Sequence, residues 1–430
     1  MIISLKKRTV ILTIISLLAY FNAIINLRKE SFDIKYIKIK EFENSYEKSF
    51  LENFISEKKI SEMKKFREIN CKDILIDNKN LIKNENPDVS VIITVYNQAN
   101  CFFSSLRSVQ NQSLKNIEII IIDDCSLDNT TEIIEKYMIE DKRIIYLKHE
   151  SNDGKIKSRS DGVRLAKGKY ITIIDGDDAL SHKDILFNCF TIANLSDVDV
   201  IEFRHALFQN KNYAYLYSNL EKIKNLKNRI IYQPELTFKF VDFTTKDSIF
   251  GMMNRNIVSK LIKNEIFQKV LQYIGPKYTE DYLLDYEDII MSNSLFHIAN
   301  SYYYMSECGY YRARGECIET YPLSNLKKCM PNNFKINKEL DPVKYLNFLL
   351  EKSKDRKIEN KLIYKELIAI NNNKRLEKRI NNDFKYVYAV LDKILKLNFY
   401  SSKMKQKIIQ LKHDLIKKEN DIKLKKFNFY

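Results

Sequence analysis

The segment KYITIIDGDD, residues 169–178, decides the fold of this 430-residue chain. Its apolar, β-branched first half predicts a β-strand over Tyr170–Ile174. That strand runs directly into Asp175, Gly176, Asp177 and Asp178, so acidic side chains gather at its carboxyl end. In open α/β sheets, ligands bind at the carboxyl ends of the strands. The segment therefore predicts both a strand and a polar binding site at its end.

Strand and helix patterns alternate on both sides of this segment. Further strands are predicted over Val89–Val95, Ile117–Ile122, Ile144–Leu147 and Val198–Phe203, and helices over 100–111, Asp128–Met138, Lys155–Ala166 and Asp184–Leu195. The first strand is an apolar, β-branched run, as expected of a strand buried on both faces. Asp128 is the expected N-cap of the second helix. The βαβ alternation predicts an α/β fold, Rossmann-like, with a mostly parallel sheet and helices on both faces.

Polar residues also follow two of the other predicted strands. Tyr96 and Asn97 come after the first strand, and Asp123 and Asp124 come after the second. In a parallel sheet these ends meet at one edge, near Asp175. Crowded carboxylates repel one another unless a cation lies among them. Mg²⁺ or Mn²⁺ prefers oxygen ligands and also binds a diphosphate, so the pattern predicts a metal-assisted site.

Three stretches of this region resemble a known family. PDVSVIITVYN (87–97), EIIIIDDCSLDNT (118–130) and NDGKIKSRSDGVRLAKGKYITIIDGDD (152–178) are similar to the successive blocks of family 2 glycosyltransferases. The resemblance is close over Pro87–Ser196 and looser to Glu319. It implies the GT-A fold of nucleotide-diphospho-sugar transferases and an inverting transfer of a sugar. The expected partners are a nucleotide sugar donor, UDP-linked, and a glycan, lipid-linked or protein acceptor.

The resemblance implies a role for each donor-site residue. Tyr96 is expected to stack on the nucleotide base, and Asn97 to shape that loop. Asp123 is expected to accept a hydrogen bond from the base, with Asp124 supporting the loop. Arg159 matches the family's arginine near the nucleotide.

The same resemblance implies a metal site and a second acidic group. Asp175 is expected to contact ribose and metal, and Asp177 to be the main ligand of Mn²⁺ or Mg²⁺. In DYLLDYEDIIM (281–291), Asp288 is expected to be the general base and Glu287 to hold the acceptor, because an acceptor hydroxyl must lose its proton as it attacks. Lys260 is expected to reach the phosphates or the acceptor.

Other interpretations of these residues stay open. Asp123 and Asp124 are also suited to cap the helix that follows, and Glu287 and Asp288 to lie at a helix N-terminus favoured by its dipole. A sugar-phosphate nucleotidyltransferase needs a Gly-rich basic loop after the first strand, where this chain has Tyr96-Asn97-Gln98-Ala99-Asn100. A catalytically inactive membrane protein with the same fold is the other alternative. No QxxRW motif occurs, which argues against a processive synthase.

Five regions are expected along the chain. Thr9–Leu27 is an uncharged run after Lys6, Lys7 and Arg8, and its 19 residues match the thickness of a bilayer as a helix. The predicted regions are a signal anchor over 1–30, a stem over 31–86, a nucleotide-sugar half over 87–205, an acceptor half over 206–320 (together a GT-A domain over 87–320) and a basic helical C-terminal region over 321–430. A cleaved signal peptide is the alternative to the anchor.

The anchor predicts a single-pass type II membrane protein of the Golgi or ER with a lumenal catalytic domain, or a protein of a bacterial cell envelope. The net charge of +16 is concentrated at the other end of the chain. Residues 343–430 hold 23 Lys and Arg against 10 Asp and Glu, so the motif-bearing part is nearly neutral. We therefore expect no nucleic-acid partner.

Overall fold

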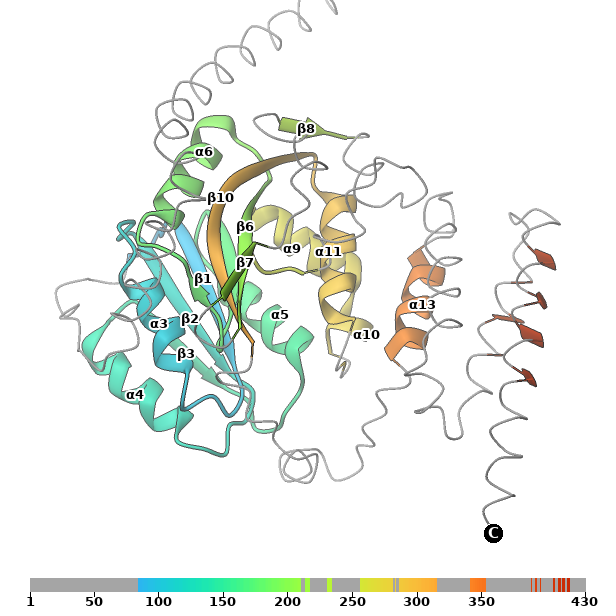
Figure 1. Ribbon diagram of the computed structural model, residues 1–430, viewed down its shortest axis with the longest axis horizontal. Coiled ribbons are helices and arrows are strands. Elements are labelled where there is room, and N and C mark those ends of the chain that lie inside the picture. The colour runs from blue at the N-terminus through green and yellow to red at the C-terminus, as the bar shows by residue number, and fades with distance from the viewer. Residues whose placement is uncertain are drawn as a thin grey trace, which may run out of the picture.

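A computed structural model describes residues 84–209, 213–216, 230–233, 256–280, 283, 286–314 and 341–352, with scattered positions between 388 and 417. These residues form an α/β fold around a 10-stranded sheet (Figure 1). The strands are β1 (Val89–Val95), β2 (Ile117–Asp123), β3 (Ile144–Lys148), β4 (Tyr170–Asp175), β5 (Ala179–Leu180), β6 (Val200–Gln209), β7 (Tyr213–Leu216), β8 (Ile230–Tyr232), β9 (Lys260–Lys263) and β10 (Ser301–Arg314).

The sheet has the order β3-β2-β1-β4-β9-β6-β10-β5, with β7 beside β6 and β8 beside β10. The strands β3, β2, β1 and β4 run parallel to one another, and β6 and β10 are also parallel. This confirms the predicted α/β fold with a mostly parallel central sheet. The sequence analysis missed β9, which runs antiparallel to both of its neighbours, β4 and β6.

Helices cover both faces of the sheet, as predicted. The helices are α3 (Phe102–Gln110), α4 (Thr130–Glu140), α5 (Lys155–Leu165), α6 (Ile185–Ser196), α9 (Asn264–Ile274), α10 (Pro276–Thr279), α11 (Glu287–Ile298) and α13 (Asp341–Lys352). Figure 1 shows α3, α4 and α6 on one side of the sheet and α5, α9, α10 and α11 on the other. Every residue of β1 and β2 is buried between these layers, which explains why both strands are mostly apolar.

The register of the parallel strands positions the polar side chains. Val95 pairs with Asp123 across β1 and β2, and Thr94 pairs with Asp175 across β1 and β4. The three strands therefore end at the same level. The acidic residues that follow β2 and β4 meet at one edge of the sheet, as the sequence predicts.

Several boundaries differ from the sequence prediction by one or more residues, and two of these differences have a clear physical reason. Helix α4 begins at Thr130 with Asn129 in the N-cap position, so the predicted N-cap at Asp128 is wrong by one residue. Asp128 still satisfies the helix start, because its carboxylate accepts a hydrogen bond from the Thr130 backbone N–H at 3.1 Å. The strand predicted over Val198–Phe203 begins at Val200 and continues to Gln209, because β10 pairs along its whole length.

Part of the C-terminal region belongs to the core. Helix α13 buries Tyr345, Phe348 and Leu349. The ring of Phe348 contacts Tyr278 edge to face at 5.1 Å between centroids, and Tyr345 lies against Tyr286 at 5.5 Å. Residues 341–352 of the C-terminal region therefore form a helix that packs on the elements around α11.

The predicted N-terminal segment over Thr9–Leu27 lies outside the described residues. Within the part of the chain that the structure describes, none of the helices has the length and apolar character that a membrane crossing requires.

Candidate active site

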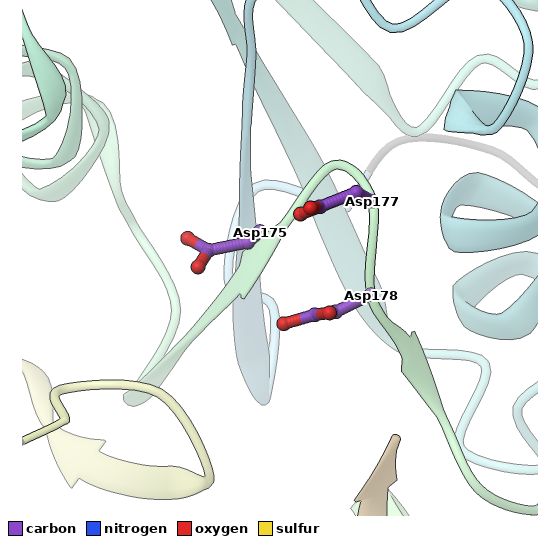
Figure 2. A group of neighbouring side chains, drawn as sticks. All are labelled: Asp175, Asp177 and Asp178. Atoms are coloured by element: carbon purple, nitrogen blue, oxygen red, sulfur yellow. The ribbon is translucent and has the colours of Figure 1, made fainter. Parts of the chain in front are cut away.

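The acidic turn, which we define as Asp175, Asp177 and Asp178, closes tightly behind β4 (Figure 2). The Asp178 backbone N–H donates to the Asp175 carbonyl at 2.9 Å, and the Gly176 N–H donates to the Thr94 carbonyl at 2.9 Å. A Cβ atom at Gly176 would lie 2.1 Å from Gln98 Oε1 and 2.6 Å from Val95 Cγ1. Only glycine fits there, so the sequence DGDD presses this turn against the end of β1.

The three carboxylates of the acidic turn fit a divalent cation. One oxygen from each lies within 4.8 Å of the others. Burial and the charge of Asp175 raise the pKa of the Asp177 carboxyl above its ordinary value, which indicates a shortage of positive charge around it. A hard cation with oxygen ligands would supply that charge, and Mg²⁺ and Mn²⁺ are such ions.

Asp178 was predicted to lie at this strand end but was not predicted to be a metal ligand. Its carboxylate lies with those of Asp175 and Asp177, and it accepts a hydrogen bond from the Tyr310 hydroxyl at 2.7 Å. The same hydroxyl accepts a hydrogen bond from the Asp175 backbone N–H at 3.2 Å. Tyr310 thus joins both ends of the turn. The signal for Asp178 was its position in the same four-residue turn, whereas Tyr310 comes from β10 and has no local signal.

Arg159 connects the acidic turn to the second acidic group. Its side chain is fully buried, and its Nη2 lies 2.8 Å from Asp175 Oδ1. Its Nη1 lies 2.9 Å from Asp288 Oδ1 and 3.8 Å from Glu287 Oε1. One guanidinium therefore brings together two groups of carboxylates that are more than a hundred residues apart in the sequence.

The acidic pair, which we define as Glu287 and Asp288, begins α11. Tyr286 precedes the helix in a left-handed conformation with φ of 76°. Besides its contact with Arg159, the Asp288 carboxylate accepts a hydrogen bond from the Ile257 N–H at 3.2 Å. Burial, together with the negative charge of Asp288, raises the pKa of Glu287 to about 7. The Asp288 side chain is 24% exposed against 7% for Glu287, so Asp288 is the more accessible of the two.

Burial alone would raise the pKa of Asp175, but the charges of Lys155 and Arg159 hold it below its ordinary value. The Lys155 Nζ lies 4.0 Å from Asp175 Oδ2.

Arg312 is a further cation beside the acidic turn. It is half-buried on β10, two residues after Tyr310 and hence on the same face of the strand. Its positive charge faces the carboxylates of Asp178, Asp175 and Asp288. The sequence analysis missed Lys155 and Arg312, although Lys155 precedes Arg159 by one helical turn.

The loops after β1 and β2 are tied together beside the acidic turn. The Asn97 side-chain oxygen accepts from the Leu127 N–H at 2.7 Å, and the Asn97 backbone N–H donates to Ser126 Oγ at 2.9 Å. Asn97 has a φ of 52°, a backbone conformation that asparagine tolerates better than most residues. Tyr96 lies half-buried at the start of the same loop. The contacts of Asn97 connect the two loops, and its predicted function in a nucleotide site and base stacking by Tyr96 both stay predictions.

Asp123 and Asp124 lie at the end of β2, where the sequence predicts them, but their oxygens already have protein partners. Asp123 accepts from the Ser126 N–H at 2.8 Å and from the hydroxyls of Thr131 and Tyr146 at 3.0 Å. Its side chain is fully buried, so the predicted contact with a base would need a movement of this loop. Asp124 accepts hydrogen bonds from the loop before α5, and its predicted support of the loop after β2 stays a prediction.

Lys260 lies within the sheet, on β9. Its Nζ is 3.3 Å from Glu202 Oε2, and both side chains are almost completely buried. It also donates a hydrogen bond to the Asn256 carbonyl at 2.7 Å. These contacts occupy Lys260 with the protein, and its predicted contact with phosphate or acceptor stays a prediction.

The comparisons with known proteins agree with this fold and site. The family model "Glycosyl transferase family 2" matches residues 90–261. The chain is 26% identical over 224 residues to glycosyltransferase GlyG of Streptococcus pneumoniae, covering 51% of this chain and 71% of GlyG. It is 30% identical over 211 residues to the uncharacterized glycosyltransferase MJ1057 of Methanocaldococcus jannaschii, covering 47% and 71%.

A solved structure has the same fold. The structure of S. aureus TarS 1–349 in complex with UDP-GlcNAc superposes with a TM-score of 0.53 at 16% identity, covering 77% of this chain and 89% of that one. The fold and the similarities together define a glycosyltransferase. The chain belongs to glycosyl transferase family 2.

Proposed function

We propose that this chain is an inverting glycosyltransferase that moves a hexose or N-acetylhexosamine from a UDP-linked donor to a hydroxyl of a glycan, a lipid-linked glycan or a protein. One observation carries the proposal: Arg159 holds Asp175 of the acidic turn and Asp288 of the acidic pair on the same guanidinium. A donor site for a diphosphate and a base for an alcohol are therefore within reach of one bound sugar. The UDP-GlcNAc complex of TarS supports a UDP-linked donor through the shared fold.

The acidic turn is the proposed metal site, with Asp177 as the main ligand and Asp175 and Asp178 beside it. When bound, Mn²⁺ or Mg²⁺ neutralises the charge that builds on the departing nucleoside diphosphate. Tyr310 and Arg159 hold the ligands Asp178 and Asp175 in place from outside. The positive charges of Lys155 and Arg312 lie beside the same carboxylates and would also attract a diphosphate.

Asp288 is the proposed general base, because its side chain is the more exposed member of the acidic pair. Its carboxylate takes the proton of the acceptor hydroxyl as that oxygen bonds to the anomeric carbon. The bond from that carbon to the diphosphate oxygen breaks on the opposite face, which inverts the carbon. Glu287 is the proposed holder of the acceptor. Its pKa of about 7 lets it donate or accept a hydrogen bond near neutral pH.

The loops after β1 and β2 are the proposed site of the nucleoside. Tyr96 would stack on the base, and Asn97 keeps the two loops together. Asp124 holds the start of α5, and α5 carries Arg159. Contacts of Asp123 with the base and of Lys260 with the donor or acceptor belong to the same proposal.

The regional organisation is also proposed from the sequence. Residues 1–30 would be a signal anchor, 31–86 a stem, 87–320 the catalytic domain and 321–430 a basic helical region. The enzyme would then be a single-pass type II membrane protein with its catalytic domain in the Golgi or ER lumen. Alkaline carbonate extraction of the full chain tests the anchor: a protein released from membranes at pH 11 has none.

The direct test is release of UDP from a panel of UDP-sugars, with and without Mn²⁺, by the wild type and by Asp177→Asn. We expect Mn²⁺-dependent release that falls by roughly 10²–10³-fold in the variant, since metal stabilisation of the leaving group amounts to several kcal/mol. Asp197→Asn is the matched control, because Asp197 is 59% exposed and pairs with Lys263 far from the turn. Equal background release by all three proteins would show a non-catalytic protein.

The nucleotidyltransferase alternative has its own product. Such an enzyme would form a UDP-sugar and pyrophosphate from UTP and a sugar phosphate. Incubation with UTP and a panel of sugar 1-phosphates, followed by a pyrophosphate assay, separates the two activities. The stereochemistry of the transfer product, read from the anomeric coupling constant by NMR, tests inversion.

A further inference from the structure

His149 lies outside the proposed catalytic groups but is placed within a cluster of carboxylates. The residue follows β3, is 9% exposed, and its backbone N–H donates to the Asp123 carbonyl at 2.9 Å. Its Nδ1 lies 2.9 Å from Asp124 Oδ1 and 3.9 Å from Asp153 Oδ2. Its Nε2 lies 3.2 Å from Asp161 Oδ2. We call these four residues the His149 cluster.

The carboxylates around His149 favour a protonated imidazole. A neutral imidazole has one N–H and one lone pair, so one of its nitrogens would face a carboxylate with a lone pair. Nδ1 hydrogen-bonds to the Asp124 carboxylate, and Nε2 lies within ion-pair distance of Asp161 without the geometry of a hydrogen bond. The imidazolium carries a positive charge that suits both carboxylates. Burial would lower the pKa of His149, but the carboxylates of Asp124 and Asp161 outweigh burial and raise it to about 9.

The His149 cluster fixes the beginning of α5. Asp124 accepts hydrogen bonds from the Asp153 N–H and the Gly154 N–H, both at 2.9 Å. Gly154 occupies the N-cap of α5 with a φ of 88°, and no side chain of its own caps the helix. Asp124, from the end of β2, therefore satisfies backbone donors that the helix start leaves open. His149 holds the Asp124 carboxylate in that position.

The cluster also holds the middle of α5, on the face opposite to the active site. Lys157, Asp161 and Arg164 are spaced by one turn and share one face of the helix, whereas Lys155 and Arg159 share the other. Asp161 pairs with His149 on the first face. Arg159 pairs with Asp175 and Asp288 on the second. His149 and the catalytic carboxylates therefore contact opposite faces of the same helix.

We propose that His149 is a positioning residue of the glycosyl-transfer site: as an imidazolium between the end of β2 and α5, it sets the position of α5 and hence of Arg159 and Lys155. The inference rests on the proposed function of that site. It predicts that donor turnover depends on the protonation of a group that touches neither donor nor acceptor.

The sign of the pH dependence follows from the charges around the ring. Asp124 faces it from the end of β2, Asp153 from the loop before α5, and Asp161 from α5 itself. Asp161 is further paired with Lys157 and Arg164, and Arg164 with Glu280 after α10. Because the pKa is raised above 6.5, the stabilising contribution is complete below pH 6.5 and is lost as the pH rises through about 9.

The first experiment measures the pKa of His149 directly. NMR of ring-labelled histidine, with His149→Gln to assign the signal, gives the pKa of His149 in the folded protein without any substrate. We expect a value well above 6.5 in the wild type and a lower value in Asp161→Asn, which removes one facing carboxylate at constant volume. A value at or below 6.5 would overturn the proposal whether or not the protein transfers sugar.

The second experiment measures the pH dependence of donor turnover at the active site. We expect kcat/KM for donor turnover in the wild type to fall as the pH rises through about 9, and the fall to move to lower pH in Asp161→Asn. His149→Gln should lose about tenfold in kcat/KM at pH 7.5 and should lack this fall. His413→Gln, at an exposed position, is the control and should match the wild type.

A purely structural histidine gives a different result. His149→Gln would then lower the melting temperature but leave the pH profile of the remaining activity superimposable on that of the wild type, and this would overturn the proposal. If the wild type turns over no donor at all, the proposed function fails, while the NMR titration still tests the His149 cluster. The two failures are therefore distinguishable.

Discussion

The acidic turn and the acidic pair lie on either side of Arg159, but they differ in what neutralises their charge. In the pair, Asp288 has a buried guanidinium at 2.9 Å and a backbone N–H at 3.2 Å. In the turn, Asp175 shares that guanidinium and Asp178 receives a hydroxyl. Among the described residues, no cation lies within ion-pair distance of Asp177, and its pKa is raised through burial and the charge of Asp175.

This difference indicates which group needs a ligand to complete it. The turn and the pair hold five carboxylates, and Lys155, Arg159 and Arg312 are the cations beside them among the described residues. With all of these groups ionised, the formal charge is −2, which matches one divalent cation. Asp177 has no cation within ion-pair distance among the described residues, whereas Asp288 is paired with Arg159 without any ligand. The turn therefore suits metal binding and the pair suits proton transfer.

The largest expected effect is on the acidic pair. Asp288→Asn keeps the shape of the side chain but removes the proposed base, and we expect turnover to fall by roughly 10²–10⁴-fold. Donor and Mn²⁺ binding should stay within about twofold of the wild type, because the acidic turn is unchanged. Isothermal titration with UDP and Mn²⁺, beside single-turnover rates, measures both. A loss of donor affinity as large as the loss of rate would mean that the pair and the turn are one binding site.

The second prediction concerns Arg159, which connects the acidic turn to the acidic pair. Arg159→Lys retains the positive charge but loses the fork that reaches Asp175 and Asp288 together. We expect the free energy of unfolding to fall by about 2–3 kcal/mol and turnover to fall by roughly 10–100-fold. Urea unfolding and initial rates measure these quantities.

Arg164→Lys is the matched control for this variant, on the opposite face of the same helix and 41% exposed. It should lose less than about 1 kcal/mol. If Arg159→Lys behaved like this control, the two acidic groups would not depend on the shared guanidinium.

The sequence predicted one of these groups better than the other. The strand ends and the DGDD turn follow from local patterns, because burial on both faces requires continuous apolar runs and the register then aligns Val95, Asp123 and Asp175. Glu287 and Asp288 were found only through a family resemblance. Their position beside Asp175 depends on α11 and α9 packing against α5, which no local pattern encodes.

Most of the missed contacts join residues from different strands, helices or loops. Tyr310 and Arg312 reach the acidic turn because β10 returns beside β5 and β6. Antiparallel β9 enters between β4 and β6, although its sequence KLIK is too short to indicate a direction. The sequence shows no constellation around His149, because its carboxylates lie after another strand, in a loop and on a helix. Long-range packing, and not local propensity, decides these contacts.

A smaller effect concerns the pH dependence of the acidic pair. Burial and the charge of Asp288 raise the pKa of Glu287 from 4.5 to about 7. The folded protein keeps this proton where the unfolded chain has lost it, so the contribution to stability is complete below pH 4.5 and is lost as the pH rises to 7. Relative to Glu287→Gln, the wild type should lose on the order of a few kcal/mol between pH 5 and 8.

Urea unfolding of both proteins at pH 5, 6, 7 and 8 gives this difference. The subtraction removes the contributions of all other groups that the two proteins share. Parallel curves would contradict the prediction, because they would show that burial and Asp288 do not raise the pKa of Glu287 in the folded protein.

The smallest expected effect concerns the support of the acidic turn. Tyr310→Phe removes the hydroxyl that donates to Asp178 at 2.7 Å and accepts from the Asp175 N–H at 3.2 Å. Both partners are left without that hydroxyl, so we expect a loss of about 1–3 kcal/mol in the free energy of unfolding. Added Mn²⁺ should recover part of this loss, because a cation replaces the lost partner of Asp178 and binding to the folded state alone raises stability.

Thermal unfolding of Tyr310→Phe with and without Mn²⁺, beside the half-exposed control Tyr232→Phe, measures this recovery of stability. Equal stabilisation of both proteins by Mn²⁺ would place the metal away from Asp178 and confine the site to Asp175 and Asp177.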